Sequence, residues 1–355
     1  MGFSVLDNPE NLEFKALQSV SNPKSVHGIY PYRGKISALD ANQVLSQFTN
    51  PIKVLDPFCG SGTIVYEAAS LGHSAIGVDL NPIAQVLTEG KISIESTLDV
   101  FLNEAEALFD EAMSLPVSPH NGTGPERYFH VDTYRQIASI AVMFDQMSPY
   151  VKACFAGAIC LAARGCNWYK WTSSTVGKDI EPKQFIDFNS KFLAKIKKHY
   201  FPVPGINAQL IKGDARDIPA LPNSSIDLVF SSPPYFDCLD YTAYYAKIVY
   251  EIIGIDRLNV KGQLIQKFSE YESDMRIVLS EMERVVKPGG LVIFVVGDKK
   301  VHGEVINGEA FFRNLTSMKY VKSIERLYSG TSSKVFDEIN KTNRKEQIVM
   351  WRNEK

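Results

Sequence analysis

A strand, a glycine-rich turn, a helix and a second strand follow one another directly between residues 52 and 82. The apolar run IKVLDPF turns polar at Asp56 and is followed by CGSGT; TIVYEAASLG then has the apolar spacing of a helix, and HSAIGVDLNP is a second apolar run. A βαβ unit of this kind needs parallel strand partners and a helix packed across the sheet. The sequence therefore predicts an α/β fold with a mostly parallel, twisted sheet and helices on both faces.

Further strand patterns lie far downstream of this unit. The apolar run QIVMWR near the C-terminus is predicted as a last strand, at or near an edge of the sheet. Three earlier apolar runs have the length of strands, and each ends at a turn or an acidic residue. They lie within residues 207–218, 225–235 and 288–298.

The second and third strands are too far apart in the chain for a minimal domain. About 100 residues are surplus to it, and loops of that length without structure are rare. Apolar spacing such as that of FLNEAEALFDEAM indicates a mostly helical insert. We therefore expect an N-terminal segment with the cofactor-binding half, an insert and a catalytic half, at residues 1–99, 100–205 and 206–355.

Composition limits the partners and surroundings of the chain. A formal net charge of −2 gives no basic excess, so nucleic acid would be bound through local patches. The five cysteines contain no CxxC pair and no histidine cluster at zinc spacing, so no metal site is predicted. Because MGFSVLDNPENLEF has no apolar signal core and no apolar run reaches transmembrane length, a cytoplasmic setting is expected.

The first chemical motif is DPFCGSGT, which begins at Asp56. Gly60 and Gly62 permit a tight turn in which the backbone approaches a ligand closely. The third glycine of a dinucleotide fingerprint is missing, and no phosphate-binding lysine follows, which favours a cofactor without a pyrophosphate. Asp79 ends the next strand, where a carboxylate can accept hydrogen bonds from ribose hydroxyls.

The second motif is SSPPY, at residues 231–235. Prolines are excluded from central strands, so Pro233 and Pro234 must lie just beyond the carboxyl end of the strand, where open α/β sheets bind ligands. The two prolines stiffen the turn and set the direction of the Pro233 carbonyl. Tyr235 then presents a flat face for stacking.

Together, these motifs resemble those of the amino-group DNA methyltransferases, which methylate adenine N6 or cytosine N4. YPYRGKI, GVDLNP, GDARDI and KPGGLVIFVVGD are also similar to segments of that group, so the resemblance covers nearly everything outside the insert and the termini. It implies a Rossmann-like methyltransferase fold, S-adenosyl-L-methionine as cofactor, DNA as substrate and a possible partner restriction endonuclease in a restriction-modification system.

The resemblance also implies residue roles. Asp79 would hold the ribose of the cofactor, and Asn81 would flank its adenine. Asp214 and Ala215 would meet the exocyclic amine of that adenine. The methionine part would be lined by Tyr30, Pro31, Asp56, Phe58, Gly60 and Gly62. The catalytic set would be Ser232, Pro233, Pro234 and Tyr235.

The chemistry of an exocyclic amine explains the second motif. Its lone pair is delocalised into the ring, so acceptors that hold its hydrogens help to free the pair for attack on a methyl group. The Pro233 carbonyl and the Ser232 hydroxyl are such acceptors, and positioning supplies much of the rate. A base inside a duplex must be flipped out, and Tyr235 would replace its lost stacking.

Serine before Pro-Pro favours cytosine N4 as the methylated atom, with adenine N6 as the alternative. Cytosine C5 chemistry needs a thiolate directly after a proline, whereas Cys238 lies three residues beyond Tyr235. Three other functions stay open: an RNA methyltransferase on the same fold, a catalytically silent nucleic-acid-binding subunit and, more remotely, a nicotinamide dehydrogenase.

The insert is the predicted target-recognition region because the cofactor fold does not require it. It interleaves basic and aromatic side chains, which suit phosphate contact and base stacking. The alternative is that these aromatic rings pack the insert onto the rest of the fold. The candidate DNA-binding residues are Arg164, Trp168, Lys170, Trp171 and Lys178, joined near the C-terminus by Lys341 and Arg344.

Overall fold

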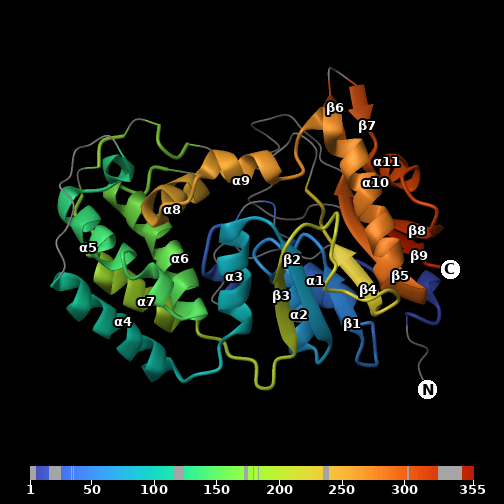
Figure 1. Cartoon of the computed structure of the whole chain (residues 1–355), viewed down its shortest axis with the longest axis horizontal. Helices are drawn as coiled ribbons and strands as arrows, with labels where there is room; N and C mark the ends of the chain where they lie inside the picture. Colours follow the sequence, from blue (N-terminus) through green and yellow to red (C-terminus); the bar gives the residue numbers. More distant parts are fainter. Residues whose placement is uncertain are drawn as a thin grey trace.

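The computed structural model shows two groups of elements side by side (Figure 1). A sheet with its covering helices forms one group, and helices that lie between the second and third strands in the chain form most of the other. The structure describes residues 5–15, 25–32, 34, 36–114, 124–171, 175–178, 180–182, 184–234, 240–301, 304–326 and 346–355.

Among these residues, seven strands form one sheet in the order β3-β2-β1-β4-β5-β9-β8. The first five strands of the chain are parallel, and β9 runs antiparallel between β5 and β8. Their bounds are β1 Lys53–Asp56, β2 Ser74–Asp79, β3 Ala208–Lys212, β4 Ile226–Ser231, β5 Val286–Gly297, β8 Lys319–Arg326 and β9 Glu346–Arg352. A separate hairpin pairs β6 Lys299–Val301 with β7 Glu304–Ile306.

The sheet confirms the predicted fold class, and it adds one strand. The C-terminal strand β9 lies next to the edge, as expected, but the edge itself is β8, which the sequence analysis did not predict. β8 reads KYVKSIER and is only partly buried along most of its length. Its weak apolar pattern reflects a position with a strand neighbour on one side only.

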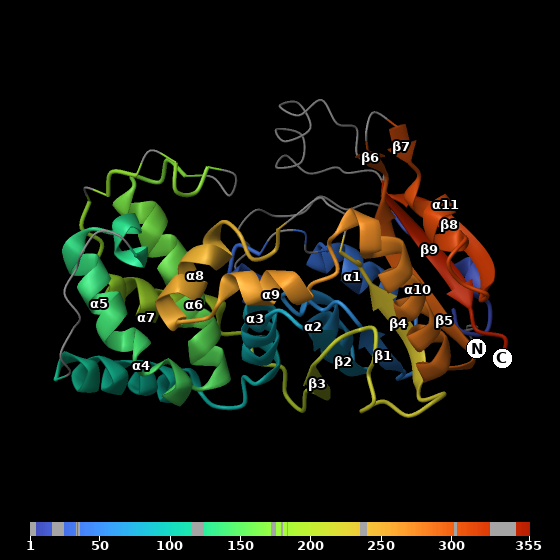
Figure 2. The same ribbon diagram turned by 45° about the horizontal axis from the view of Figure 1, so that its top comes forward.

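Alternate residues of the strands face opposite layers of helices. In β1, Val54 belongs to the core beneath α1 (Ala38–Leu45) and α2 (Thr63–Ser70). The next residue, Leu55, belongs to the core beneath α10 (Phe268–Val285) and α11 (Gly308–Arg313). Because both faces are buried, β4 and the second half of β5 are almost continuously apolar, whereas the edge strand β3 is only partly buried. The helices on both faces are visible when the molecule is tilted (Figure 2).

The remaining helices form a third core with the segment around Tyr30. α6 is the most buried of them, and its Gly157 allows close crossing, since a Cβ there would lie 1.9 Å from the Ile29 carbonyl oxygen. The helices between β2 and β3 are α3 Pro82–Ile92, α4 Leu98–Met113, α5 Val131–Ala141, α6 Pro149–Cys166 and α7 Phe188–His199. Short 3-10 helices lie at Pro9–Asn11, Val26–Gly28, Pro125–Tyr128 and Phe144–Gln146.

Two helices after β4 connect the groups. α8 (Tyr245–Ile253) packs with α6 in the third core, and α9 (Arg257–Gln263) leads on towards α10. Figures 1 and 2 both show α8 and α9 running between the helical group and the sheet. None of the described helices is long and apolar enough to cross a membrane.

Candidate active site

A cavity lies at the carboxyl ends of the parallel strands, where β1 lies between β2 and β4 in the sheet. This is the switch point at which open α/β sheets hold their ligands, because connections leave it in opposite directions. The cavity measures about 820 Å³, counting the space open to solvent at its mouth. It brings together most of the predicted site: Asp56, Phe58, Gly60, Asp79, Asn81, Asp214, Ala215, Ser232 and Pro234 all line it.

Asp56 links the two sequence motifs. Its Oδ1 accepts a hydrogen bond from the Ser231 hydroxyl at 2.6 Å and one from the Phe58 amide at 3.2 Å. Burial nevertheless raises the pKa of Asp56 to about 7. Ser231 is fully buried, so the first serine of SSPPY ties the cofactor turn to the catalytic turn. The sequence analysis gave Ser231 no role, although its place one residue before Ser232 was the available signal.

Asp79 closes the glycine turn from the neighbouring strand. Its Oδ2 accepts from the Gly60 amide at 2.8 Å, and its Oδ1 accepts from the Asn81 amide at 2.9 Å. Burial raises the pKa of Asp79 to about 6. Gly60 has φ +52°, and a Cβ at this position would lie 3.1 Å from the ring of Tyr32. The turn therefore requires glycine both for its conformation and for the space beside the cavity.

Asn81 offers a buried donor to a ligand. Its Oδ1 accepts from the Ile83 amide at 3.0 Å as the N-cap of α3, and also from the Tyr250 hydroxyl at 2.5 Å. An amide N–H can only donate, so the bond from Ile83 fixes which end of the side chain is oxygen. Asn81 Nδ2 is then buried with no hydrogen-bond partner among the described residues. An acceptor atom of a nucleoside would satisfy it, so the residues present fit the predicted cofactor.

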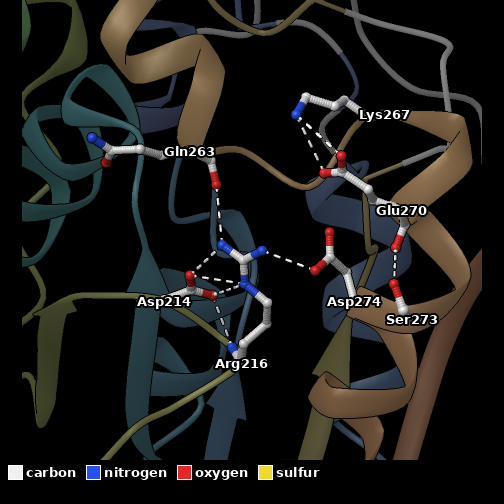
Figure 3. Close-up of polar contacts among 7 residues, drawn as sticks. All are labelled: Asp214, Arg216, Gln263, Lys267, Glu270, Ser273 and Asp274. Atoms are coloured by element: carbon white, nitrogen blue, oxygen red, sulfur yellow. Dashed lines mark hydrogen bonds and ion pairs between the residues drawn. The ribbon is translucent and has the colours of Figure 1, made fainter.

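Asp214 is held by an arginine in the same turn (Figure 3). The Arg216 side chain donates to both carboxylate oxygens at 2.6–3.1 Å, and the Arg216 amide donates to Oδ1 at 2.9 Å. A carboxylate has about four acceptor positions, so most of them are used. The acceptor position that is left could take the hydrogen bond from the exocyclic amine of the cofactor that the sequence predicts. Ala215 is buried beside it in the cavity wall.

The catalytic turn enters the same cavity. Ser232 and Pro234 line it, whereas Pro233 is buried behind them. The Ser232 hydroxyl reaches the Val295 carbonyl of β5 at 3.5 Å, the limit of a hydrogen bond, so it can turn to another acceptor or donor. The Pro234 carbonyl accepts from the Tyr271 hydroxyl at 2.6 Å, which anchors the turn to α10. Tyr235 and Cys238 lie outside the described residues.

Tyr30 and Pro31 lie in an adjacent pocket and not in the cavity itself. The pocket measures about 380 Å³ and shares Tyr32 and Tyr241 with the cavity. Its other lining residues are Asp240, Ala243, Tyr244, Tyr245 and Ala246. We call it the tyrosine pocket. The motif YPYRGKI does reach the site, but its third residue, Tyr32, is the one that touches the cavity.

Gly62 also serves a different purpose from the predicted one. It does not line the cavity, and it caps the N-terminus of α2 with φ +70°. A Cβ there would lie 2.7 Å from the Thr88 hydroxyl, so this glycine allows α2 and α3 to approach. Leu264 and Ile265 line the cavity without any motif that could have identified them.

The exposed aromatic pair on the helical group is Trp168 and Tyr169, which are 56% and 46% exposed. Both have positive φ, at +56° and +58°, an uncommon conformation for aromatic residues. Lys170 and Lys178 are exposed, and Arg164 is half-buried below the ring of Tyr169. The role of these residues in DNA binding stays a prediction. Lys341 and Arg344 lie outside the described residues.

Trp171 is a correction to the predicted DNA-binding set. It is only 4% exposed, and its indole nitrogen donates to the Lys178 carbonyl at 3.2 Å. Its ring packs edge-on against Tyr128, with centroids 5.9 Å apart. No face of the ring is open for a base, so packing within the helical group accounts for this tryptophan.

Several known proteins resemble the chain. Type II methyltransferase M.MjaII of Methanocaldococcus jannaschii is 22% identical, and the match covers 82% of this chain and 75% of that protein. Type II methyltransferase M.BsoBI of Geobacillus stearothermophilus is also 22% identical, over 72% of this chain and 58% of that protein. The solved rRNA methyltransferase aviRa of Streptomyces viridochromogenes aligns with 91% of this chain and 88% of its own, at 11% identity and a TM-score of 0.37.

The family model of the D12 class matches residues 41–286 of the 355. That span runs from α1 to the start of β5 and contains both chemical motifs and the helices between them. The chain therefore belongs to the D12 class of N6 adenine-specific DNA methyltransferases, whose cofactor is S-adenosylmethionine.

Proposed function

We propose that this protein transfers a methyl group from S-adenosylmethionine to the N6 atom of an adenine at specific sites in DNA. The observation that carries the proposal is the meeting of four strand ends at one cavity. Asp56, Asp79 and Asp214 come from the cofactor-type turns, and Ser232 and Pro234 from the catalytic turn. The first set would face the cofactor and the second the target base, which are the two substrates of a single transfer step.

The family favours adenine over cytosine as the target base. Its description names N6-adenine specificity, whereas the serine before Pro-Pro favours cytosine N4. The two amines need the same chemistry, because each is an exocyclic nitrogen conjugated with a ring. The turn at Ser232–Pro234 suits either, so cytosine N4 is the second candidate.

The chain would supply binding and orientation to the cofactor. S-Adenosylmethionine brings an electrophilic methyl group on a sulfonium centre. Each Asp79 oxygen accepts one backbone hydrogen bond, so each has a further acceptor position for a ribose hydroxyl. Asn81 Nδ2 would donate a hydrogen bond to an acceptor atom of the adenosine. Asp56 would lie beside the methionine part, where its ionised form stabilises positive charge.

The tyrosine pocket would receive the flipped base. It adjoins the cofactor cavity through Tyr32 and Tyr241, and its aromatic walls can replace the stacking that the base loses. The Ser232 hydroxyl and the Pro233 carbonyl would accept the hydrogens of the exocyclic amine. Its nitrogen would then be positioned for in-line attack, and the proton would leave after the transfer.

The DNA would cross the exposed aromatic pair on its way to this pocket. Arg164 lies near the end of α6, which packs against α8, and Tyr245 of the tyrosine pocket is the first residue of α8. Arg164 also lies below the ring of Tyr169, with 5.9 Å from its guanidinium carbon to the ring centroid. Arg164, Trp168, Lys170 and Lys178 would thus contact DNA next to the flipped base. Such a role implies a cytoplasmic location and is compatible with a partner restriction endonuclease.

Mass spectrometry of nucleosides tests the proposal. Unmethylated plasmid DNA is incubated with the protein and S-adenosylmethionine, digested and analysed, with Asp79→Ala protein as the control. N6-methyladenine is the expected product. N4-methylcytosine would retain the cofactor and site but replace the base. Cofactor binding without any methylated DNA base would contradict a DNA substrate and direct the same assay to RNA.

A further inference from the structure

Arg216 ties the turn after β3 to two segments much later in the chain. Its guanidinium contacts Asp214 in the turn after β3, Asp274 on α10 and the backbone carbonyl of Gln263 at the end of α9 (Figure 3). The distances are 2.6 Å from Nη2 to Asp214 Oδ2, 2.9 Å from Nη1 to Asp274 Oδ1 and 3.2 Å from Nη2 to the Gln263 oxygen. Nε also donates to the two Asp214 oxygens, at 3.1 and 2.9 Å, so all three guanidinium nitrogens are used.

Two of the segments that Arg216 joins line the cofactor cavity. Asp214 and Ala215 line it directly before the arginine in the chain. Leu264 and Ile265 line it directly after the carbonyl that the arginine binds. Ile265 is buried against the core beneath α10, whereas Gln263 is exposed. The backbone at Gln263, the last residue of α9, is thus held to the turn after β3 by the Arg216 side chain.

We propose that Arg216 is a positioning residue for the adenosine end of the cofactor. It holds the segment of Leu264 and Ile265 to the segment of Asp214 and Ala215, both of which line the cavity, and it orients the Asp214 carboxylate. A planar guanidinium suits this task because its donors have a fixed geometry, which a lysine ammonium does not reproduce. This inference rests on the proposed function, since it concerns the same cofactor.

A purely stabilising role would be the plainer explanation, and the chain contains a matched control for it. Arg284, near the other end of α10, makes a similar set of bonds. It pairs with Glu281 at 2.6 Å and donates to the carbonyls of Ile218 and Leu221 at 3.1 and 2.8 Å. The two arginines have similar side-chain exposure, 28% for Arg216 and 32% for Arg284. None of the groups that Arg284 binds lines the cavity.

The test compares Arg216→Gln, Arg216→Lys and Arg284→Gln with the unaltered protein. Isothermal titration with S-adenosylhomocysteine measures cofactor-site affinity, and thermal unfolding without ligand measures stability. Arg216→Gln should raise the Kd by roughly 5- to 100-fold, because the residues that line the cavity on either side of its contacts would be displaced. Arg216→Lys should recover only part of the affinity. Arg284→Gln should lower the melting temperature similarly but leave the Kd within about twofold.

Equal Kd values for Arg216→Gln and the unaltered protein would overturn the inference. So would an equal loss of affinity in Arg284→Gln, since the effect would then be one of general stability. If the unaltered protein itself failed to bind S-adenosylhomocysteine, the proposed function would fail and not the positioning role alone. Should Arg216→Gln not fold, Asp274→Asn removes one contact of Arg216 without touching Asp214, and a smaller rise in Kd is expected.

Discussion

At the scale of single residues, the site depends on two buried carboxylic acids whose pKa values are raised. Burial brings the pKa of Asp56 to about 7 and that of Asp79 to about 6. The pKa of an unfolded aspartate is about 3.9. Between that pH and the folded pKa values, the folded state therefore binds more protons than the unfolded state. Both groups therefore lower the free energy of unfolding as pH rises from roughly 4 towards their folded pKa values. Ligand groups that favour the ionised form would recover part of this loss.

The raised pKa of Asp79 predicts a pH-dependent affinity for the cofactor. Ribose hydroxyls donate to ionised Asp79, so the Kd for S-adenosylhomocysteine should fall roughly tenfold from pH 5 to pH 7. In Asp79→Asn the affinity should be lower at pH 7, and the component centred near pH 6 should be absent, although Asp56 still titrates. Titration calorimetry at several pH values measures both curves. Parallel curves for the two proteins would show that Asp79 does not contact the cofactor.

At the scale of elements, α9 connects the tyrosine pocket with the cofactor cavity. This helix of seven residues is held at one end by Arg216 through the Gln263 carbonyl. At its other end, Arg257 pairs with Asp240 at 2.7 Å and donates to the Thr242 carbonyl at 2.9 Å. Asp240 lines the tyrosine pocket, so each end of α9 is tied to a different pocket. The two ends should therefore be separable by mutation.

Arg257→Gln is expected to impair use of DNA and to spare the cofactor. The change removes the bond to the Thr242 carbonyl and one of the two ion pairs of Asp240, the other being with Lys261. The segment from Asp240 to Thr242 is then held less firmly, so the KM for DNA should rise about tenfold or kcat should fall. The Kd for S-adenosylhomocysteine should change by less than about twofold. Steady-state kinetics and calorimetry measure the two effects, with Arg276→Gln as control for the loss of an exposed pair with Glu272. A change in cofactor affinity without a change in DNA kinetics would contradict this separation.

At the scale of the whole molecule, the helices between β2 and β3 stand beside the sheet and carry the exposed aromatic pair. Their core is shared with α8 and with the segment around Tyr30, so they also support the tyrosine pocket. If these helices recognise the DNA sequence, the surface that determines specificity lies next to the flipped base in the tyrosine pocket. The division of the chain at residues 100–205 remains a proposal.

Exchange of residues 100–205 for the equivalent segment of a relative tests this role. The chimera should methylate the relative's site, as read by sequencing of modified DNA, and should keep its affinity for S-adenosylhomocysteine within about threefold. Since α6 packs closely on α3, a second chimera that also exchanges α3 guards against a mismatched interface. Unchanged specificity in a folded, active chimera would direct attention to residues 236–285.

Local patterns were sufficient for the part of the site that lies on strand ends. Asp56, Asp79 and Asp214 each follow an apolar run, and parallel strands bring their carboxyl ends to one edge of a sheet. The Pro-Pro turn had to lie at that edge as well, because prolines are excluded from the strand before it. The fold class and the place of the site followed from these periodicities and turns, whereas the roles of Phe58, Asn81, Asp214 and Ala215 were implied by the resemblance to amino-group methyltransferases.

Only the tertiary structure decided which side chains complete the walls. Leu264 and Ile265 reach the cavity because Arg216 binds the carbonyl before them, a contact across the chain that leaves no local pattern. Trp168 and Trp171 are three residues apart in one basic-aromatic stretch, yet one is exposed and the other is buried. Sequence shows the type of a side chain and its spacing. Its exposure depends on which neighbours pack against it, and those neighbours come from distant parts of the chain.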